Sequence, residues 1–269
     1  MSSIEIILPG ESLKLAPESP GFAHGFGLFE TMHLRGGCLG LWEAHWQRLT
    51  HSACELGIAS CFEQAEVLEA VRTLAKELPD EAVIKLSLLK EGPTSRLVVY
   101  SRPLSVLPEV IGLLLESAAP VNEGSPLVRH KTHNYLENLL VLAAAREAGC
   151  FDALRLNLKG DVAEGAISNL FFYRDGYLHT PCVECGLLPG VLRGALIECL
   201  EVKQGGYRLT DLVEAEAVFL TNASVGLQPV DYLHLKDRKI QLQSRQHACR
   251  EPAQRLLADY IERRSIQVF

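Results

Sequence analysis

The order of apolar and polar residues in the first half of the chain predicts a small mixed α/β unit. A β-prone run ends at Gly36-Gly37, a pair that adopts positive φ without steric cost and so turns the chain into a second strand. Apolar residues then recur at helical spacing as far as Gly57, which is typical of a helix C-terminus. The elements expected here are strands at Phe26–Arg35 and Cys38–Leu41, helices at Trp42–Leu56 and Glu63–Leu78, and strands at Ala82–Leu89 and Arg96–Tyr100.

The second half predicts a larger unit in which strands and helices also mix. A stretch rich in Pro, Ser and Gly (103–126) precedes it, so we expect a boundary near residues 119–125. This gives a smaller N-terminal α/β domain (1–120) and a larger C-terminal domain (121–269). Because strict βαβ alternation is missing, a mixed α/β (α+β) two-domain architecture is favoured. The expected elements are strand Val110–Glu116, helix Asn134–Ala148, strands Ala153–Asn157, Asn169–Tyr173 and Tyr177–Thr180, a helix from about Gly190 to Leu200, strand Ala217–Leu220 and helix Arg245–Arg264.

Composition narrows the class of protein. Of 269 residues, 48% are hydrophobic and 22% charged, which excludes a disordered chain. The excess of 33 Asp+Glu over 26 Lys+Arg gives a net charge of −7, which argues against a general nucleic-acid binder. No apolar run reaches the roughly 18 residues of a membrane span, and no signal peptide is expected. Eight cysteines at irregular spacing indicate reduced thiols in a cytoplasmic protein.

Two basic residues are candidates for chemistry, each with a simpler alternative. Lys131 stands just before a predicted helix in Arg129-His130-Lys131-Thr132-His133-Asn134-Tyr135, and a lone lysine is most simply a solvated one. Neighbouring cations would instead help to make its amine a nucleophile near neutral pH. Arg48, on the helix predicted at Trp42–Leu56, is equally open to interpretation as a surface charge or a phosphate ligand.

Three further segments are candidates for cofactor or anion binding. Glu164 lies between two small residues that leave space beside its carboxylate, although a turn carboxylate that caps backbone N–H groups is the simpler interpretation. The helix that begins after Pro189-Gly190 presents N–H groups suited to phosphate, as many helices do without a ligand. Short polar residues in Thr221-Asn222-Ala223-Ser224 follow a buried strand and can donate hydrogen bonds to an anion.

Two other motifs are not expected to be functional. Cys182-Val183-Glu184-Cys185, with His179 nearby, suggests a metal, but no second pair of ligands stands at zinc-site spacing, so no metal site is expected. The short Gly25-Phe26-Gly27 lacks the G-x-G-x-x-G pattern of a dinucleotide-binding turn.

Taken in order, the candidate segments resemble those of the fold-type IV family of pyridoxal-phosphate enzymes. This family includes branched-chain aminotransferases, D-amino-acid transaminases and 4-amino-4-deoxychorismate lyases. The resemblance runs from about Ser19 to Asp231 and rests on the order of six motifs. These are Gly25-Phe-Gly-Leu-Phe-Glu-Thr31, His45-Trp-Gln-Arg-Leu49, Lys131-Thr-His-Asn134, Glu164-Gly-Ala-Ile-Ser-Asn169, Leu188-Pro-Gly-Val-Leu-Arg193 and Thr221-Asn-Ala…Gln228-Pro-Val230. It implies a two-domain fold like that of D-amino-acid aminotransferases.

The resemblance also implies pyridoxal 5′-phosphate as cofactor, with the following roles. Lys131 would be the catalytic lysine that bonds covalently to the cofactor and later moves protons. Glu164 would pair with the pyridine nitrogen and keep it protonated, which makes the ring an electron sink. The phosphate would be held by Arg48, the backbone N–H groups of Val191 and Leu192, Asn222, and the amide of Ala223.

Within the family, the segments near the substrate favour the lyase branch. Phe29 stands where D-amino-acid transaminases carry a tyrosine. The stretch Lys90-Glu-Gly-Pro-Thr-Ser-Arg96 lacks the Arg-Gly pair common to the transaminase and lyase branches, so Lys90 or Arg96 would have to bind a substrate carboxylate. The short spacing Lys131-Thr-His-Asn134 resembles the lyase and D-transaminase branches more than the branched-chain one, and Phe29-Glu-Thr-Met32 and the compact length favour the lyase. We therefore expect a 4-amino-4-deoxychorismate lyase, a cytoplasmic enzyme of folate biosynthesis that forms 4-aminobenzoate and pyruvate.

Two alternatives stay open. One is a class IV aminotransferase that acts on branched-chain or D-amino acids, and the other is a non-catalytic relative that binds the cofactor or a partner. The resemblance implies a small-molecule amino substrate and a homodimer. Neither nucleic acid nor a membrane is expected as a partner.

Overall fold

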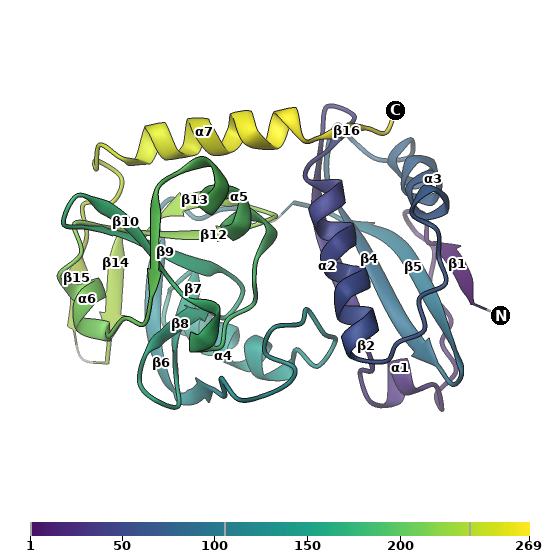
Figure 1. Ribbon diagram of the computed structural model, residues 1–269, viewed down its shortest axis with the longest axis horizontal. Coiled ribbons are helices and arrows are strands. Elements are labelled where there is room, and N and C mark those ends of the chain that lie inside the picture. The colour runs from purple at the N-terminus through teal and green to yellow at the C-terminus, as the bar shows by residue number, and fades with distance from the viewer. Residues whose placement is uncertain (1, 105, 237) are drawn as a thin grey trace. The chain divides into compact units, whose positions relative to one another are not determined.

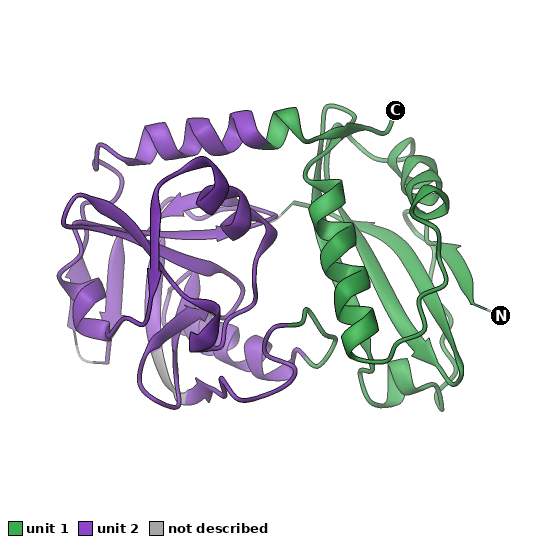
Figure 2. Ribbon diagram, in the orientation of Figure 1, with its two compact units in different colours: residues 1–105, 130–134, 261–269 green, residues 106–129, 135–260 purple. Residues whose placement is uncertain are grey.

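The computed structural model describes residues 2–104, 106–236 and 238–269, which form two compact units (Figures 1 and 2). Unit 1 comprises residues 1–105, 130–134 and 261–269, and unit 2 comprises residues 106–129 and 135–260. The mixed α/β class expected from the sequence is confirmed, because both units combine helices with sheets. Within the described stretches, no helix has both the length and the apolar character needed to cross a membrane.

Unit 1 is built on a six-stranded sheet (Figure 1). The strand order is β1-β5-β4-β2-β3-β16, and all neighbours are antiparallel except β1 and β5. Apolar residues of α2 and α3 share one hydrophobic core with the sheet. The elements are β1 (Ser3–Ile6), α1 (Pro20–Ala23), β2 (Gly27–Arg35), β3 (Cys38–Leu39), α2 (Trp42–Glu55), α3 (Gln64–Ala75), β4 (Glu81–Glu91), β5 (Thr94–Arg102) and β16 (Ile266–Gln267).

Strand β2 presents different chemistry on its two faces. Successive side chains of a strand point to opposite faces of the sheet. Leu28 and Met32 belong to the core that α2 covers, and Glu30 lies between them on the same face, fully buried. Phe29 and Thr31 project from the other face. One strand therefore supplies residues to two different environments.

The segment that carries Lys131 lies alongside β2 and belongs to unit 1. Thr132 forms an isolated antiparallel bridge with Leu28. The Phe29 N–H donates to the Lys131 carbonyl at 2.8 Å, and the His133 N–H donates to the Gly27 carbonyl at 2.9 Å. The chain therefore does not divide into its two units at the single boundary near residue 120 that the sequence predicted. Strand β6 passes through that position.

Unit 2 contains two five-stranded sheets, ordered β11-β10-β9-β12-β13 and β15-β14-β6-β7-β8. Apolar side chains from both sheets share one core. The strands are β6 (Gly112–Val121), β7 (Asp152–Asn157), β8 (Val162–Gly165), β9 (Asn169–Arg174), β10 (Tyr177–Pro181), β11 (Val202–Gly205), β12 (Ala217–Asn222), β13 (Gly226–Pro229), β14 (Tyr232–Leu235) and β15 (Arg238–Gln241). The helices are α4 (Leu136–Glu147), the 3₁₀ helix η1 (Val183–Cys185), α5 (Val191–Cys199), α6 (Leu209–Val213) and α7 (Arg250–Arg263), whose last turn is assigned to unit 1.

Most elements expected from periodicity occur within a few residues of their predicted bounds, and the differences have local causes. The turn interpretation of the Glu164 segment is wrong, because that segment pairs with β7 as strand β8. The last helix begins at Arg250 and not at Arg245. Arg245 instead forms a two-pronged ion pair with Asp231, with Nε–Oδ1 and Nη2–Oδ2 distances of 2.5 and 2.8 Å.

Replacing Leu86 with alanine is expected to destabilise unit 1. Leu86 is fully buried in the core of β4, so its loss removes apolar contacts and leaves a cavity, at a cost of about 2–5 kcal/mol in the free energy of unfolding. Both tryptophans of the chain lie on α2, so tryptophan fluorescence during urea titration reports on unit 1. Phe22→Ala, at a side chain that is 61% exposed, is the control. Equal midpoints for the two variants would contradict the core assignment.

Candidate active site

Lys131 and Phe29 are brought together in unit 1. The Lys131 Nζ lies 4.5 Å from the centroid of the Phe29 ring. A cation over an aromatic face is stabilised by the quadrupole of the ring. Together with the backbone hydrogen bond from Phe29, this contact places the amine beside strand β2.

A second amine, which the sequence analysis did not single out, contacts the same ring. The Lys85 Nζ on β4 lies 4.4 Å from the Phe29 ring centroid and 5.8 Å from that of Tyr100. Burial, with a contribution from the charge of Arg102, lowers the pKa of Lys85 to about 8. A sequence signal existed, since Lys85 is the one charged residue in the apolar run Ala82–Leu89.

His133 completes the group around Phe29, with the two ring centroids 5.4 Å apart. Burial and the charge of Lys85 lower the pKa of His133 to about 4, so the imidazole is neutral at pH 7. Its Nε2 is buried and has no hydrogen-bond partner among the residues that the structure describes. A buried polar atom of this kind is costly unless a ligand satisfies it.

Arg48 is held by a buried carboxylate on the other face of β2. Its Nε donates to Glu30 Oε1 at 2.8 Å and its Nη2 donates to Glu30 Oε2 at 2.6 Å. Nδ1 of His45 lies 2.7 Å from Glu30 Oε2. Burial alone would raise the pKa of Glu30, but the charge of Arg48 and the hydrogen bonds from His45 and Arg48 outweigh it and lower the pKa to about 2.

The two basic residues predicted to bind substrate have other partners. The Lys90 Nζ lies 4.3 Å from the ring centroid of Phe26. Arg96 forms ion pairs with Glu5 at 2.9 Å and with Glu91 at 2.8 Å. None of the described contacts joins Lys90 or Arg96 to Phe29, whose ring contacts the amines of Lys85 and Lys131.

Glu164 is placed in unit 2 by a short hydrogen-bond network. It lies on β8, mostly buried, and its Oε2 accepts the Leu188 N–H at 3.0 Å and the Asn169 Nδ2 at 3.3 Å. Asn169 Nδ2 also donates to the Leu188 carbonyl at 2.8 Å. The carboxylate is thereby tied to the loop that leads into α5.

Helix α5 begins without a side-chain cap among the described residues. Val191 and Leu192 are its first two residues. Their N–H groups have no partner within the helix, because the first turn has no preceding carbonyls. A Cβ at the N-cap Gly190 would meet Asn169 Oδ1, so a larger residue there would displace the Asn169 side chain.

The Asn222 side chain stabilises its own turn. Its Oδ1 accepts the Ser224 and Val225 N–H groups at 2.9 and 3.2 Å, and its Nδ2 donates to the Ile167 carbonyl at 3.3 Å. Next to it, Thr221 Oγ1 is buried with no hydrogen-bond partner in the described part of the chain. Any hydrogen bonds from this turn to an anion are thus more readily supplied by backbone N–H groups, such as that of Ala223, and by Thr221 than by the Asn222 amide.

A buried acid, Asp152, supports the loop between β8 and β9. Its Oδ2 accepts the Ile167 N–H at 3.4 Å and its Oδ1 accepts the Ala153 N–H at 2.8 Å. Gly165 packs so closely on it that an added Cβ would meet Oδ2. Burial raises the pKa of Asp152 to about 6, although these hydrogen bonds and one with Ser168 oppose the shift.

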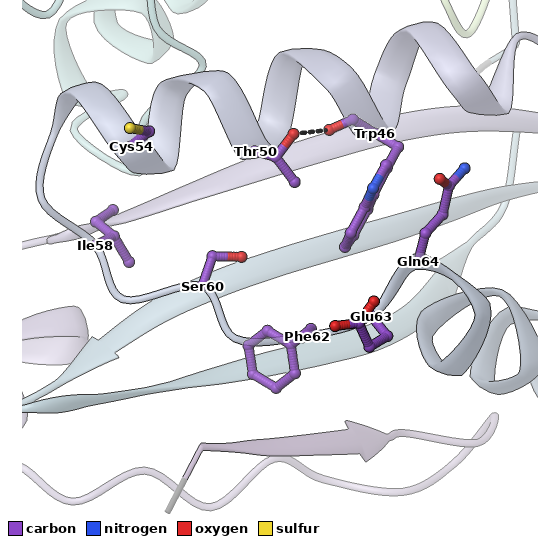
Figure 3. Close-up of a pocket in the computed structure, with 8 residues that line it drawn as sticks. All are labelled: Trp46, Thr50, Cys54, Ile58, Ser60, Phe62, Glu63 and Gln64. Atoms are coloured by element: carbon purple, nitrogen blue, oxygen red, sulfur yellow. Dashed lines mark hydrogen bonds between the residues drawn. The ribbon is translucent and has the colours of Figure 1, made fainter.

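Unit 1 also has a cavity of about 490 Å³ that contains none of the predicted site residues. Figure 3 shows it between α2, the loop that follows, and the start of α3. The Thr50 hydroxyl, which could have faced a ligand, donates to the Trp46 carbonyl at 2.9 Å. The residues that line the cavity are Trp46, Thr50, Cys54, Ile58, Ser60, Phe62, Glu63 and Gln64.

Cys182 and Cys185 lie close together in unit 2, with their Sγ atoms 3.7 Å apart. Across residues 2–104, 106–236 and 238–269, no three His, Cys, Asp or Glu side chains gather in a way that suits a metal ion.

A comparison of the chain with models of known protein families identifies its family. The family model described as Amino-transferase class IV matches residues 27–233, which include every predicted site residue in both units. The chain belongs to the class IV aminotransferase family. Members of this family are pyridoxal-phosphate-dependent enzymes, so the expected cofactor and the expected enzymatic nature of the protein are confirmed.

Individual class IV proteins are similar over most of the chain. An aminodeoxychorismate lyase of Bacillus subtilis (strain 168) is 33% identical over 238 residues, which cover 80% of each protein. A candidate 4-amino-4-deoxychorismate lyase from Legionella pneumophila has a similar solved structure, with a TM-score of 0.86, 27% identity and coverage of 96% of this chain and 99% of that one. A hypothetical aminotransferase from Mycobacterium tuberculosis in its PLP-bound form has a TM-score of 0.81 at 25% identity, covering 95% of each chain.

Replacing Asp152 with asparagine is expected to flatten the dependence of stability on pH. The folded-state pKa of about 6 lies above the ordinary value of 3.8, so the stabilisation is present below pH 3.8 and is lost as the pH rises through 6. Between pH 5 and pH 8, the wild-type free energy of unfolding should fall by about 1 kcal/mol on account of this group. Asparagine does not titrate, so the variant should lack that fall in urea titrations.

Asp80→Asn, at an exposed aspartate, is the matched control and should keep the wild-type pH dependence. A wild-type slope in Asp152→Asn would show that the acid does not titrate in this range.

Proposed function

We propose that this class IV protein is a 4-amino-4-deoxychorismate lyase that uses pyridoxal phosphate to form 4-aminobenzoate and pyruvate. The observation that carries the proposal is the pair of amines on Phe29, where Lys131 and Lys85 lie 4.5 and 4.4 Å from the ring centroid. One amine suits the cofactor aldehyde, and the other suits an anionic group of the substrate. The similarity to the Bacillus subtilis lyase supports the same assignment.

The residues of each unit fit the chemical groups of the cofactor. A primary amine (Lys131) suits an aldehyde, and a guanidinium (Arg48) suits a phosphate. In unit 2, the uncapped N-terminus of α5, the N–H of Ala223 and the Thr221 Oγ1, which has no hydrogen-bond partner among the described residues, suit phosphate oxygens. The buried carboxylate of Glu164 suits a protonated ring nitrogen. We propose these as the residues that hold pyridoxal phosphate, with Asn222 acting by shaping its turn.

Each of these residues has a defined task in the proposed reaction. When bound, the cofactor withdraws electrons from the substrate carbon that bears nitrogen, which makes the proton on that carbon acidic. The Lys131 amine would accept this proton at Nζ. Glu164 keeps a proton on the ring nitrogen, because an adjacent carboxylate stabilises the cationic form. The C–O bond between the ring and the side chain would then break, and pyruvate would leave as its enolate and take up the proton held by Lys131. Aromatisation of the ring makes the reaction strongly downhill.

Lys85 is the residue that best separates a lyase from a branched-chain aminotransferase. Its pKa of about 8 leaves it mostly cationic at pH 7, so it places a charge beside Phe29. Aminodeoxychorismate is a dicarboxylate and benefits from this second cation. A branched-chain substrate would need an apolar surface there, because burying an alkyl group against a charge is unfavourable.

The same assignment leads us to propose a cytoplasmic homodimer that acts in folate biosynthesis. Support for a dimer comes from helix α4, which exposes Leu136, Leu139 and Leu140 by 69%, 52% and 62%. These leucines lie three and four residues apart, so they form one apolar stripe. Such a stripe is typical of a surface that another chain covers.

The purified protein, loaded with pyridoxal phosphate, should convert aminodeoxychorismate to 4-aminobenzoate and pyruvate without any added keto acid. Lys131→Ala should lose the yellow colour of the bound cofactor and at least about 10³-fold of the turnover, since it removes both the covalent attachment and the proton acceptor. Chromatography of 4-aminobenzoate and the visible absorbance measure the two effects.

Lys76→Gln, which removes an exposed lysine of unit 1, is the control for the loss of an amine. Turnover only with D- or branched-chain amino acids plus 2-oxoglutarate would contradict the lyase assignment and show that the protein is an aminotransferase. Absence of any cofactor colour in the wild type would favour a non-catalytic relative.

Lys85→Gln is expected to raise KM for aminodeoxychorismate about tenfold or more, with a smaller effect on kcat. A charge-assisted hydrogen bond is worth about 1.5–3 kcal/mol, and it would be lost in both the bound substrate and the transition state. The visible absorbance of the bound cofactor should stay as in the wild type. An unchanged KM would show that Lys85 does not bind the substrate. The main structural reason to prefer the lyase would then be lost.

A further inference from the structure

Glu30 is a charged group in an apolar environment that the proposed reaction does not itself use. It lies on the core face of β2 between Leu28 and Met32, and it is 1% exposed. A carboxylate in such a place is retained only where partners compensate for the loss of water. Its partners therefore show what the carboxylate does.

Both partners come from one face of helix α2. His45 and Arg48 are three residues apart, so their side chains lie next to each other on the helix surface. Glu30 receives the Arg48 guanidinium through two parallel hydrogen bonds, at 2.8 and 2.6 Å, and the His45 ring at 2.7 Å. A two-pronged bond fixes both the position and the plane of a guanidinium, which a single bond does not.

The charges in this group are complementary. Glu30 is ionised, since its pKa is lowered to about 2. Burial lowers the pKa of His45, although Glu30 opposes the shift, so the ring is neutral at pH 7 and donates its Nδ1–H to the carboxylate. One positive and one negative charge thus remain, and His45 orients the carboxylate without adding charge.

We infer that Glu30, itself oriented by His45, is a positioning residue that fixes the Arg48 guanidinium for the phosphate of the cofactor. This inference rests on the proposed role of Arg48 in binding phosphate. An arginine side chain without such a partner has many rotamers, and ordering it on ligand binding costs entropy. Glu30 removes that cost before the cofactor arrives.

The alternative is that Glu30 and Arg48 form only a structural ion pair of the core. The two cases differ in which ligands bind more weakly when Glu30 is lost. A positioning residue acts on the phosphate alone, whereas a structural residue affects every ligand of the folded unit.

The experiment compares pyridoxal phosphate with pyridoxal, which has the same aldehyde and ring but no phosphate. Equilibrium titrations of the apoprotein, followed by the absorbance of the bound aldehyde, give Kd for each ligand. For Glu30→Gln we expect Kd for pyridoxal phosphate to rise about tenfold or more, as for outer partners that orient ligand-binding groups. Kd for pyridoxal should change less than twofold. A parallel rise in both constants, or no rise in either, would overturn the inference.

Two control variants separate this inference from its premise. Arg48→Lys keeps the charge and loses the two-pronged geometry, so it should weaken pyridoxal phosphate selectively. If Arg48→Lys does so and Glu30→Gln does not, the positioning role of Glu30 is wrong. If neither does, Arg48 does not bind the phosphate and the inference falls with it. Glu77→Gln, at an exposed glutamate of unit 1, should leave both constants unchanged.

A milder pair of variants covers the case in which Glu30→Gln does not fold. His45→Leu keeps the ion pair and removes the donor that orients the carboxylate, so it should weaken pyridoxal phosphate selectively by a few-fold. His45→Asn restores a donor and should recover most of the loss. Equal effects of His45→Leu on both ligands, or equal behaviour of the leucine and asparagine variants, would overturn the inference. None of these measurements uses aminodeoxychorismate, so their outcome is independent of the reaction that the enzyme catalyses.

Discussion

The pleat of strand β2 is the constraint on which unit 1 depends. Because consecutive side chains alternate between the faces of a sheet, Phe29 and Glu30 cannot serve the same environment. Phe29 meets two lysines and a neutral histidine on one face, and Glu30 meets the basic side chains of α2 on the other. A shift of one residue in the pairing with β4 would exchange these environments and bury the wrong side chains.

In unit 2, hydrogen bonds between buried polar groups fix the loops around Glu164. Asn169 connects Glu164 to the loop before α5, and Asp152 supports the loop that joins Glu164 to Asn169. Burial makes each of these groups costly unless it is hydrogen-bonded. Buried acids such as Glu30 and Asp152 thus lie next to candidate ligand-binding segments in both units. Burying them lowers the stability of the fold locally, and their hydrogen bonds fix the geometry of these segments.

Much of the fold was predictable because its signals are local. Helical spacing of Trp42, Trp46 and Leu49 marks α2 within one residue of its end, and positive φ at Gly36 and Gly37 confirms the expected hairpin turn. Short strands with weak periodicity, such as β8, escaped prediction, because only their pairing with distant strands makes them strands. The placement of residues 130–134 beside β2 has the same origin, since bridge partners over a hundred residues apart leave no local pattern.

The sequence by itself determined the family, the cofactor and the motifs that carry Lys131, Arg48 and Glu164, because these follow from residue order. Only the tertiary structure decided that the amines of Lys85 and Lys131 lie beside Phe29, while Lys90 and Arg96 have other partners. It likewise decided that Arg48 binds the buried carboxylate of Glu30 and that the Asn222 side chain accepts hydrogen bonds within its own turn. Partners of charged and polar side chains are chosen by burial and distance in the folded chain, which spacing along a sequence does not encode.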